Sequence, residues 1–411
     1  MHPLNTRLLS SISAYTLLVL VVLVFLWHTV IPASGKLTAG FMAYFVAAQT
    51  VQKGEPGTRL YDEKWFAARV MAESRGTVTD IYLANPPALA VAWLPFAFLR
   101  VDAARQVWIA VSVLCLAGSM WLVACELGWS RHPWALAGLS ALFTLPAPTR
   151  EQFSFGQMYA CLLLLHVIAW RAYLRRRDAR AGISLGAAMT LKISGWPVCL
   201  LMLAQRRWLA VRWLIVTAAA GTLLSLPWVG IAAWRTFLVE EIPHTLRRGV
   251  AALTAYQDTA SFWQHLFRYV PQFNPTPVLD APLLATALTL ATTIAASLLL
   301  IARMQSTSLT FVAAVALSEL LGPAAEQYHY ILLLLPLAVL WHTAYESRDR
   351  VLGVCALAAT LLIAVPINYK AAHPMWSLLY NYPRLIGGWI AFSGLYLADR
   401  DLTRHAAPVS S

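Results

Sequence analysis

Charged residues are scarce in this chain: 12% of its 411 residues are Asp, Glu, Lys or Arg, against 59% that are hydrophobic. A soluble protein of this composition would carry a largely apolar surface, and the mean hydropathy of +0.61 agrees. Cysteine is also rare, and all 5 cysteines lie in apolar runs without metal-ligand spacing. These scarcities exclude a disulfide framework and a zinc site, and they favour a polytopic membrane protein.

Acidic residues are scarcer than basic ones, 19 against 31, which leaves a net charge of +12. A nucleic-acid-binding protein would gather this charge on one face. Here the arginines and lysines fall in short loops between apolar runs, where the positive-inside rule and anionic headgroups account for them. We therefore expect membrane lipids as partners and no nucleic acid.

The long apolar runs predict an all-α bundle of about twelve helical segments, residues 1–411 forming a single integral membrane domain. Because no small-residue cleavage site follows the first run, we interpret it as a retained span rather than a signal peptide. The candidate spans are 8–33, 82–100, 106–127, 133–148, 154–174, 181–203, 208–230, 281–303, 306–322, 329–345, 350–367 and 383–398.

Two long segments, 35–80 and 231–280, separate groups of spans. In the first, Phe41, Tyr44 and Phe45 follow a helical spacing, and a turn sequence comes after them. The second has aromatic residues at similar spacings. Both segments are expected to be extracytoplasmic loops with helices lying in the membrane interface.

The densest arginine clusters, at 175–180, 206–212, 348–350 and 400–404, are expected to face the cytoplasm. If every candidate span crossed the membrane in turn from a cytoplasmic N-terminus, the cluster at 175–180 would lie outside instead. The conflict disappears if one segment between 82 and 148 does not cross and if 181–203 is a hairpin of two half-helices broken around Lys192. This arrangement places Lys192 and Gln157 on the outer side together with 35–80.

Lys192 is the strongest candidate for a functional side chain within the membrane. An unpaired charge there costs about 3 kcal/mol or more. It follows an otherwise uncharged stretch, 181–191. One interpretation is a lysine that extends to the interface. The other is a cation that neutralises a phosphate arriving from the membrane.

Further ionisable residues lie at the ends of spans or inside them. Glu326 and His329 share a helix face, which suits general acid–base catalysis as well as a capping cluster. A metal site is not expected, because no second histidine stands at ligand spacing. Glu126 and Glu319 would suit a proton relay in a transporter, but the chain lacks the paired interrupted spans of secondary carriers.

An ordered set of short motifs resembles glycosyltransferase family 87, over about residues 10–345. The set comprises Gly40 to Ala48, Lys53-Gly54-Glu55, Leu60-Tyr61-Asp62, Asn85-Pro86-Pro87-Ala88-Leu89, Leu94 to Ala97, Phe155-Gly156-Gln157, Gly182 to Lys192, Arg206-Arg207-Trp208, Tyr256-Gln257-Asp258 with Ser261, Pro323 to His329, and Pro336. Each motif is weak by itself, and the order carries the resemblance.

The resemblance implies a C-type glycosyltransferase fold, in which a multi-span helical bundle carries an outer loop with interfacial helices over a cavity. It also implies a mannosyltransferase of the bacterial inner membrane. Such enzymes take a sugar, mannose-like by analogy, from a polyprenyl-phosphate donor and transfer it to a glycolipid or glycan acceptor. No cofactor and no metal are implied.

By the same resemblance, Lys192 would hold the donor phosphate and Gln157 and Asn85 would orient sugar hydroxyls, while His329 with Glu326 would assist near the phosphate or acceptor. Tyr44 and Gln257 are further substrate-binding candidates. Tyr44 is also typical of an interfacial aromatic belt, and Gln257 of a helix end.

One position departs from the family pattern, which has an aspartate before Phe41 as the base that deprotonates the acceptor. This chain has Gly40 there, and glycine has no side chain to take a proton. The base has moved to Asp62, Glu151 or Glu326, or the chain is an impaired lipid-linked-sugar binder or flippase partner, or this sequence carries a substitution. If only the base is lost, Gly40→Asp should raise transfer strongly.

Overall fold

The computed structural model describes residues 3–83, 85–248, 254–304, 307–366 and 378–406, and in these it is helical without a named strand. The first half contains α1 (Pro3–Phe25), α2 (Ile31–Ser34), α3 (Phe41–Gln52), α4 (Glu63–Glu73), α5 (Pro87–Ala92), α6 (Leu94–Ala97), α7 (Val101–Glu126), α8 (Pro133–Thr144), α9 (Ala147–Phe155), α10 (Tyr159–Leu174) and α11 (Asp178–Leu191). The second half contains α12 (Trp196–Ala204), α13 (Trp208–Thr236), α14 (Ile242–Arg248), α15 (Thr259–Phe267), α16 (Pro282–Arg303), α17 (Thr307–Leu320), α18 (Leu334–Ser347), α19 (Arg350–Ala364), α20 (Leu378–Asn381) and α21 (Pro383–Ala406). Short π-helical or 3-10 segments are η1 (Leu26–Val30), η2 (Gly57–Tyr61), η3 (Trp129–Arg131), η4 (Phe237–Glu241) and η5 (Gln327–Leu333).

Among the described residues, 5 helical runs are long and apolar enough to cross a membrane. The first has 26 residues and a mean hydropathy of 2.5, which at 1.5 Å per residue gives about 39 Å, more than a hydrocarbon core of about 30 Å. The all-α, multi-pass class expected from composition is thereby confirmed. The 5 runs are Leu9–Ser34, Val101–Glu126, Trp208–Thr245, Pro282–Arg303 and Gln327–Ser347.

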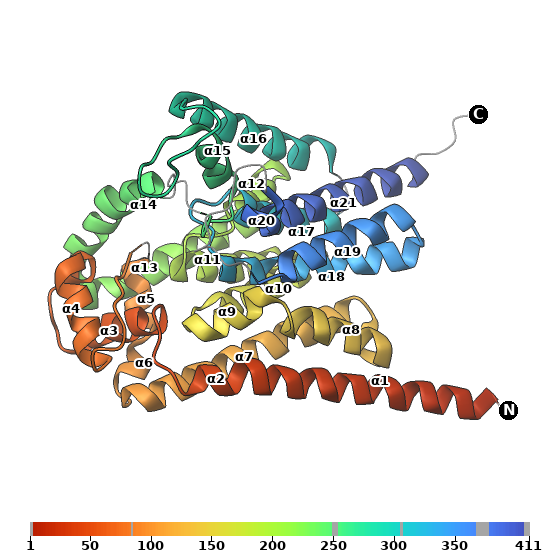
Figure 1. The fold of residues 1–411 in the computed structure, drawn as a ribbon, viewed down its shortest axis with the longest axis horizontal. Helices are drawn as coiled ribbons and strands as arrows, with labels where there is room; N and C mark the ends of the chain where they lie inside the picture. Colours follow the sequence, from red (N-terminus) through yellow and green to blue (C-terminus); the bar gives the residue numbers. More distant parts are fainter. Residues whose placement is uncertain (1–2, 84, 249–253, 305–306, 367–377, 407–411) are drawn as a thin grey trace.

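The chain crosses the molecule lengthwise several times (Figure 1). Both termini lie at one end of the long axis, and α3, α4, α5 and α14 lie at the other. Segment 35–80 forms part of that second end. In it α3 is buried on all sides, whereas α4 buries only Phe66 and Val70.

Candidate span 82–100 is not a single crossing helix. Its described part holds only α5 and α6, helices of 6 and 4 residues. Prolines at the start of each helix explain the break, because proline suits a first helical turn and disfavours a helical residue before it. Neither helix is long enough to span a bilayer, so we propose 82–100 as the segment between 82 and 148 that does not cross.

Segment 181–203 is two helices joined by a short break, as expected. Helix α11 ends at Leu191 and α12 begins at Trp196, so Lys192 lies at the tip between them. The two helix ends farthest from Lys192 also meet. There the Arg207 guanidinium, just after α12, lies 3.0 Å from the carboxylate of Asp178, the first residue of α11. An ion pair at the base and Lys192 at the tip identify a hairpin.

The second long segment starts later than residue 231. Helix α13 continues to Thr236 through a kink at Gly230 and runs on through η4 into α14. The loop proper then holds α15. Helix α13 also supports the first loop, because a Cβ at Gly57 would lie 2.0 Å from the Val229 carbonyl oxygen.

Candidate functional site

A cavity of about 630 Å³ opens where the first loop, the hairpin tip and the 322–329 turn meet. Its walls come from segments far apart in sequence. Residues from 39–44, 80–85, 155–159, 192–196, 237–256 and 318–329 line it. Its polar lining groups include Tyr44, Asp80, Asn85, Gln157, Tyr159, Lys192, Ser194, Thr245, Tyr256, Ser318, Glu319, Glu326, Tyr328 and His329.

Lys192 is half-buried in this cavity. Among the described lining residues, no other lysine or arginine is present. Its ammonium Nζ donates to the Tyr44 hydroxyl at 3.4 Å and lies 5.0 Å from the Tyr159 ring centroid. No ion pair joins it to a carboxylate of the described residues within 4.0 Å. A cation held by a hydroxyl and an aromatic face still has room for an anion.

Gln157 is buried and its side-chain oxygen accepts a hydrogen bond from the Tyr44 hydroxyl. The backbone around it is fixed from outside the cavity. Arg105 donates to the Phe153 carbonyl at 2.9 Å, and Trp108 donates to the Gly156 carbonyl at 2.8 Å. Two buried side chains of α7 therefore hold the turn that presents Gln157.

Asn85 also lines the cavity, next to the start of α5. Its side-chain nitrogen donates to the Leu83 carbonyl at 3.1 Å. Its side-chain oxygen is buried and has no hydrogen-bond partner among the described residues. A buried carbonyl oxygen without a partner is costly, so this atom is suited to a ligand donor such as a hydroxyl.

Asp80 was not among the residues that the sequence singled out, yet it lies in the cavity wall beside Gly40. Its Oδ2 accepts the Gly40 backbone N–H at 2.6 Å and its Oδ1 accepts the Ile81 N–H at 2.9 Å. Burial raises the pKa of Asp80 to about 6, with Glu326 acting in the same direction and the Ile81 N–H and Lys192 against it. No periodicity or motif surrounds Asp80, so only its spatial neighbours mark it.

Residues 319–329 bring two glutamates and a histidine to the cavity. Glu326 and His329 both line the cavity, and His329 Nδ1 lies 3.6 Å from a carboxylate oxygen of Glu319. The His329 ring also stacks on Tyr159, with centroids 4.2 Å apart. This wall can accept or donate protons toward a bound molecule.

Gln257 lies behind this wall and does not line the cavity. Its backbone N–H donates to the Ala325 carbonyl at 2.8 Å, and its side chain donates to the Asn381 carbonyl at 2.8 Å. Next to it the buried Asp258 accepts the Ala325 N–H at 3.0 Å. Gln257 and Asp258 thus position the turn that carries Glu326.

Of the three carboxylates expected as replacement bases, the structure brings one into the cavity. Asp62 caps α4, pairs with Arg59 at 2.9 Å, and is outside the cavity. Glu151 is also outside and lies 3.4 Å from Arg384. Glu326 alone of the three is a lining residue.

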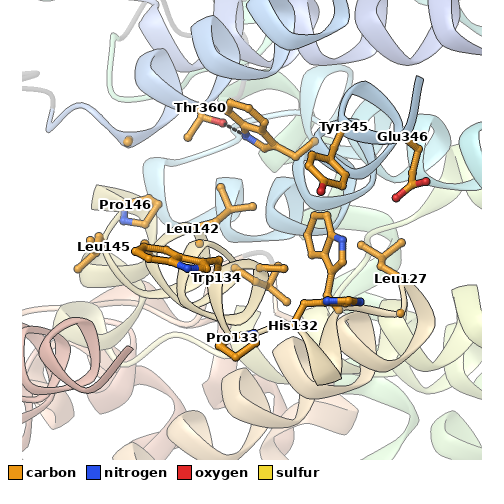
Figure 2. A pocket seen from close by; sticks show the side chains of 18 residues that line it. Leu127, His132, Pro133, Trp134, Leu142, Leu145, Pro146, Tyr345, Glu346 and Thr360 are labelled. Atoms are coloured by element: carbon orange, nitrogen blue, oxygen red, sulfur yellow. Dashed lines mark hydrogen bonds between the residues drawn. The ribbon is translucent and has the colours of Figure 1, made fainter. Parts of the chain in front are cut away.

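A larger cavity of about 1110 Å³ lies between the turn at 127–132, α8, α18 and α19 (Figure 2). Its walls are mainly aromatic and aliphatic, with Trp129, Trp134 and Trp341 among them. Its described lining residues include Glu346 and no lysine or arginine. Because it lacks converging polar groups, the smaller cavity is the stronger candidate for chemistry.

The residues of the described ranges contain no group of 3 or more His, Cys, Asp or Glu that could hold a metal ion. The described lining residues of the candidate site supply one lysine, three carboxylates, a histidine and several hydroxyl and amide groups.

Known proteins resemble this chain in its sequence. The family model described as glycosyltransferase family 87 matches residues 82–325. A polyprenol-phosphate-mannose-dependent alpha-(1-2)-phosphatidylinositol mannoside mannosyltransferase of Mycobacterium tuberculosis is 24% identical over 350 residues, which is 79% of this chain and 78% of the relative. The protein of the same name from Mycolicibacterium smegmatis is 29% identical over 197 residues, 44% of this chain and 43% of the relative. No solved structure matches the chain.

Proposed function

The chain belongs to glycosyltransferase family 87, and from this premise we propose that it transfers a mannose-like sugar from a polyprenyl-phosphate donor to a glycolipid acceptor in the cavity around Lys192. Both relatives are named for a polyprenol-phosphate-mannose donor and a phosphatidylinositol mannoside acceptor. We extend the donor class and a glycolipid acceptor to this chain.

The position of Lys192 carries the proposal. Its ammonium lies at the tip of a hairpin, with a hydroxyl and an aromatic ring as partners and no paired carboxylate in the part of the chain that the structure describes. An unpaired cation at this depth is costly unless an anion arrives to neutralise it. The phosphate of a membrane-borne donor has that charge, and it reaches the site from the lipid phase.

Asn85 and Gln157 are the proposed sugar-binding residues. The Asn85 side-chain oxygen has no partner in the described residues and can accept from a sugar hydroxyl. Gln157 keeps a side-chain NH₂ group as donor while its oxygen accepts from Tyr44. Tyr44 therefore links the sugar-binding amide to the cation that holds the phosphate.

His329 and Glu326, which both line the cavity, are proposed to bind near the phosphate or the acceptor. We also propose that the cavity opens toward the outer face of a bacterial inner membrane. The arginine-rich loops support this orientation, because they would then lie in the cytoplasm.

The cavity contains carboxylates as well as a cation, which favours an enzyme over the alternative of a lipid-linked-sugar binder. Asp80, Glu319 and Glu326 all line it together with Lys192. A binder needs the cation for the phosphate but has no use for a proton acceptor, whereas sugar transfer to a hydroxyl needs both.

Incubation of the purified protein in lipid nanodiscs with labelled polyprenyl-phosphate mannose and a native lipid extract tests the proposal. We expect a labelled glycolipid whose mass has grown by one hexose. The matched control is the Lys192→Met protein, which should form much less product. Binding of the donor with no transfer to any lipid of the extract would favour the binder.

A further inference from the structure

We propose that Asp80 is the catalytic base of this site, and that the backbone N–H of Gly40 holds its carboxylate next to a position that has no room for a side chain of its own. The inference rests on the proposed function, since a base is needed only where a hydroxyl acceptor is activated. It names a residue that the sequence motifs do not mark.

The Asp80 carboxylate is fixed by backbone donors alone. Gly40 is the N-cap of α3, and its N–H donates to Oδ2 at 2.6 Å, while the N–H of Ile81 donates to Oδ1 at 2.9 Å. A carboxylate has about four lone-pair sites, so two remain for a substrate. The N-terminal end of α3 also favours a negative charge there.

Position 40 cannot supply a carboxylate itself in this backbone. Gly40 has φ +44°, a value that L side chains rarely adopt, and a Cβ there would lie 2.5 Å from the Gln157 Nε2 and 2.8 Å from the Phe155 carbonyl oxygen. Gln157 therefore occupies the place of a side chain at 40. A carboxylate can approach this point from the 80–85 segment, and Asp80 does.

The other two carboxylates of the cavity already have side-chain partners. Glu319 lies 3.6 Å from the ring of His329, and Glu326 is hydrogen-bonded to the Tyr328 side chain. Asp80 has only backbone N–H partners among the described residues. Its proton-accepting lone pairs are thus the ones that a substrate hydroxyl can reach without breaking a side-chain contact.

The step balances without a further reactant. The acceptor hydroxyl loses its proton to an Asp80 oxygen, and the acceptor oxygen forms a bond to the anomeric carbon of the donor sugar. The bond between that carbon and the phosphate oxygen breaks, and its electron pair leaves with the polyprenyl phosphate, whose new negative charge Lys192 neutralises. Asp80 then returns the proton to solvent.

This assignment makes a prediction for pH dependence. The pKa of Asp80 is raised to about 6 by burial, and a base works only when it is deprotonated, so transfer should rise with pH through about 6 and level off above it. Several charged or titratable groups share the cavity with Asp80 and act on the same window. They are Tyr44 of α3, Tyr159 of α10, Lys192 of the hairpin, Tyr256 before α15, Glu319 of α17, Glu326 of the 322–326 turn, and Tyr328 and His329 of η5.

Asp80→Asn tests the base directly. We expect kcat for mannose transfer to fall by about 10²–10⁴-fold, with binding of polyprenyl-phosphate mannose within about threefold of the wild type and the rise near pH 6 abolished. The matched control is Asp102→Asn, because Asp102 is an exposed aspartate paired with Arg75 away from the cavity. That variant should keep wild-type kcat and pH profile.

Each outcome points to one conclusion. Asp80→Asn with more than a tenth of wild-type kcat overturns the inference, and loss of turnover in Glu326→Gln instead would assign the base to Glu326. Should Asp80→Asn fail to fold, the wild-type profile still decides, since transfer that is flat between pH 5 and 8 excludes this base. Wild-type protein that transfers no mannose contradicts the proposed function rather than the assignment of Asp80.

Discussion

The Lys192 ammonium contacts a phenol hydroxyl and an aromatic ring, both uncharged, so the shape and the charge of its side chain can be separated by substitution. Lys192→Met keeps the apolar stem but removes the cation, whereas Lys192→Arg keeps a cation with a different geometry. Because a charge-assisted hydrogen bond contributes about 1.5–3 kcal/mol, Lys192→Met should weaken binding of polyprenyl-phosphate mannose by about 10–100-fold.

Lys192→Arg should lose much less affinity, and titration of both variants with the labelled donor measures the difference. Equal affinity of the two variants would mean that Lys192 only extends to the interface. In that case the donor phosphate binds elsewhere in the cavity.

Gly40 is the second residue whose role the structure redefines. From the sequence, Gly40→Asp is expected to raise transfer by restoring a lost carboxylate. The observed φ of +44° and the 2.5 Å approach to Gln157 Nε2 predict the opposite. An added side chain must displace Gln157 and so break the hydrogen bond that Gln157 accepts from Tyr44.

We therefore expect Gly40→Ala and Gly40→Asp to lower the free energy of unfolding by about 1–3 kcal/mol and to reduce transfer. Thermal unfolding in detergent and the mannose-transfer assay measure the two effects. Gly76→Ala is the control, because Gly76 also has a positive φ, +80°, but open space around it. Higher activity of Gly40→Asp would show that position 40 accepts a catalytic side chain.

At the scale of the element, the hairpin owes its position to the close approach of α11 and α13. A Cβ at Gly182 would lie 2.1 Å from the Ala210 carbonyl oxygen, and one at Gly186 would lie 2.6 Å from that of Leu214. Small residues four apart let two helices approach closely in a membrane, where packing rather than hydrophobicity drives association. This contact holds the helix that ends one residue before Lys192.

Gly182→Ala should consequently separate α11 from α13 and lower the free energy of unfolding by about 1–3 kcal/mol. Donor affinity should fall as well, since the Lys192 tip shifts with its helix. Gly353→Ala in α19 is the matched control, because a Cβ there meets nothing within 4 Å and alanine is the better helix former by about 1 kcal/mol. Equal thermal midpoints for both variants would rule out the tight contact.

At the scale of the whole molecule, the proposed outward site requires 35–80 and the arginine-rich loops to lie on opposite sides of the membrane. Lys64 in α4 and Ser347 at the end of α18 are both exposed and mark the two sides. In a background with the native cysteines replaced, Lys64→Cys should react with a membrane-impermeant maleimide in intact cells. Ser347→Cys should react only after lysis, and the reverse pattern would place the site in the cytoplasm.

The membrane class and much of the helix order were predictable from the sequence because they depend on local composition. A run of about twenty apolar residues spans a bilayer whatever surrounds it, and 17–26 needs no tertiary partner to be recognised. The hairpin was also predictable, since Gly195 and Pro197 interrupt an apolar segment and arginines lie on both sides of it. The division of 82–100 into two short helices was not predictable from hydropathy. The segment is apolar throughout, and it is the prolines that interrupt the helix.

The site was predictable only where a residue is unusual for its surroundings. Lys192 stands out as a charge in an apolar segment, and its contact with Tyr44 at 3.4 Å joins the two regions that orientation rules had placed on one side. Asp80 does not stand out, because an aspartate in a polar loop is ordinary. Its importance comes from the 2.6 Å hydrogen bond to Gly40, 40 positions earlier in the chain, and such a pairing is a property of the packed structure.

The sequence by itself determined that this chain is a helical membrane protein and a member of a sugar-transferring family, since hydropathy and motif order are properties of the chain alone. Tertiary structure decided which polar groups share a cavity. It placed Asp62 and Glu151 outside, brought Glu326 inside, and put Asp80 against the backbone N–H of Gly40. The physical reason is that a carboxylate becomes a base through its distance to other groups, and folding alone sets that distance.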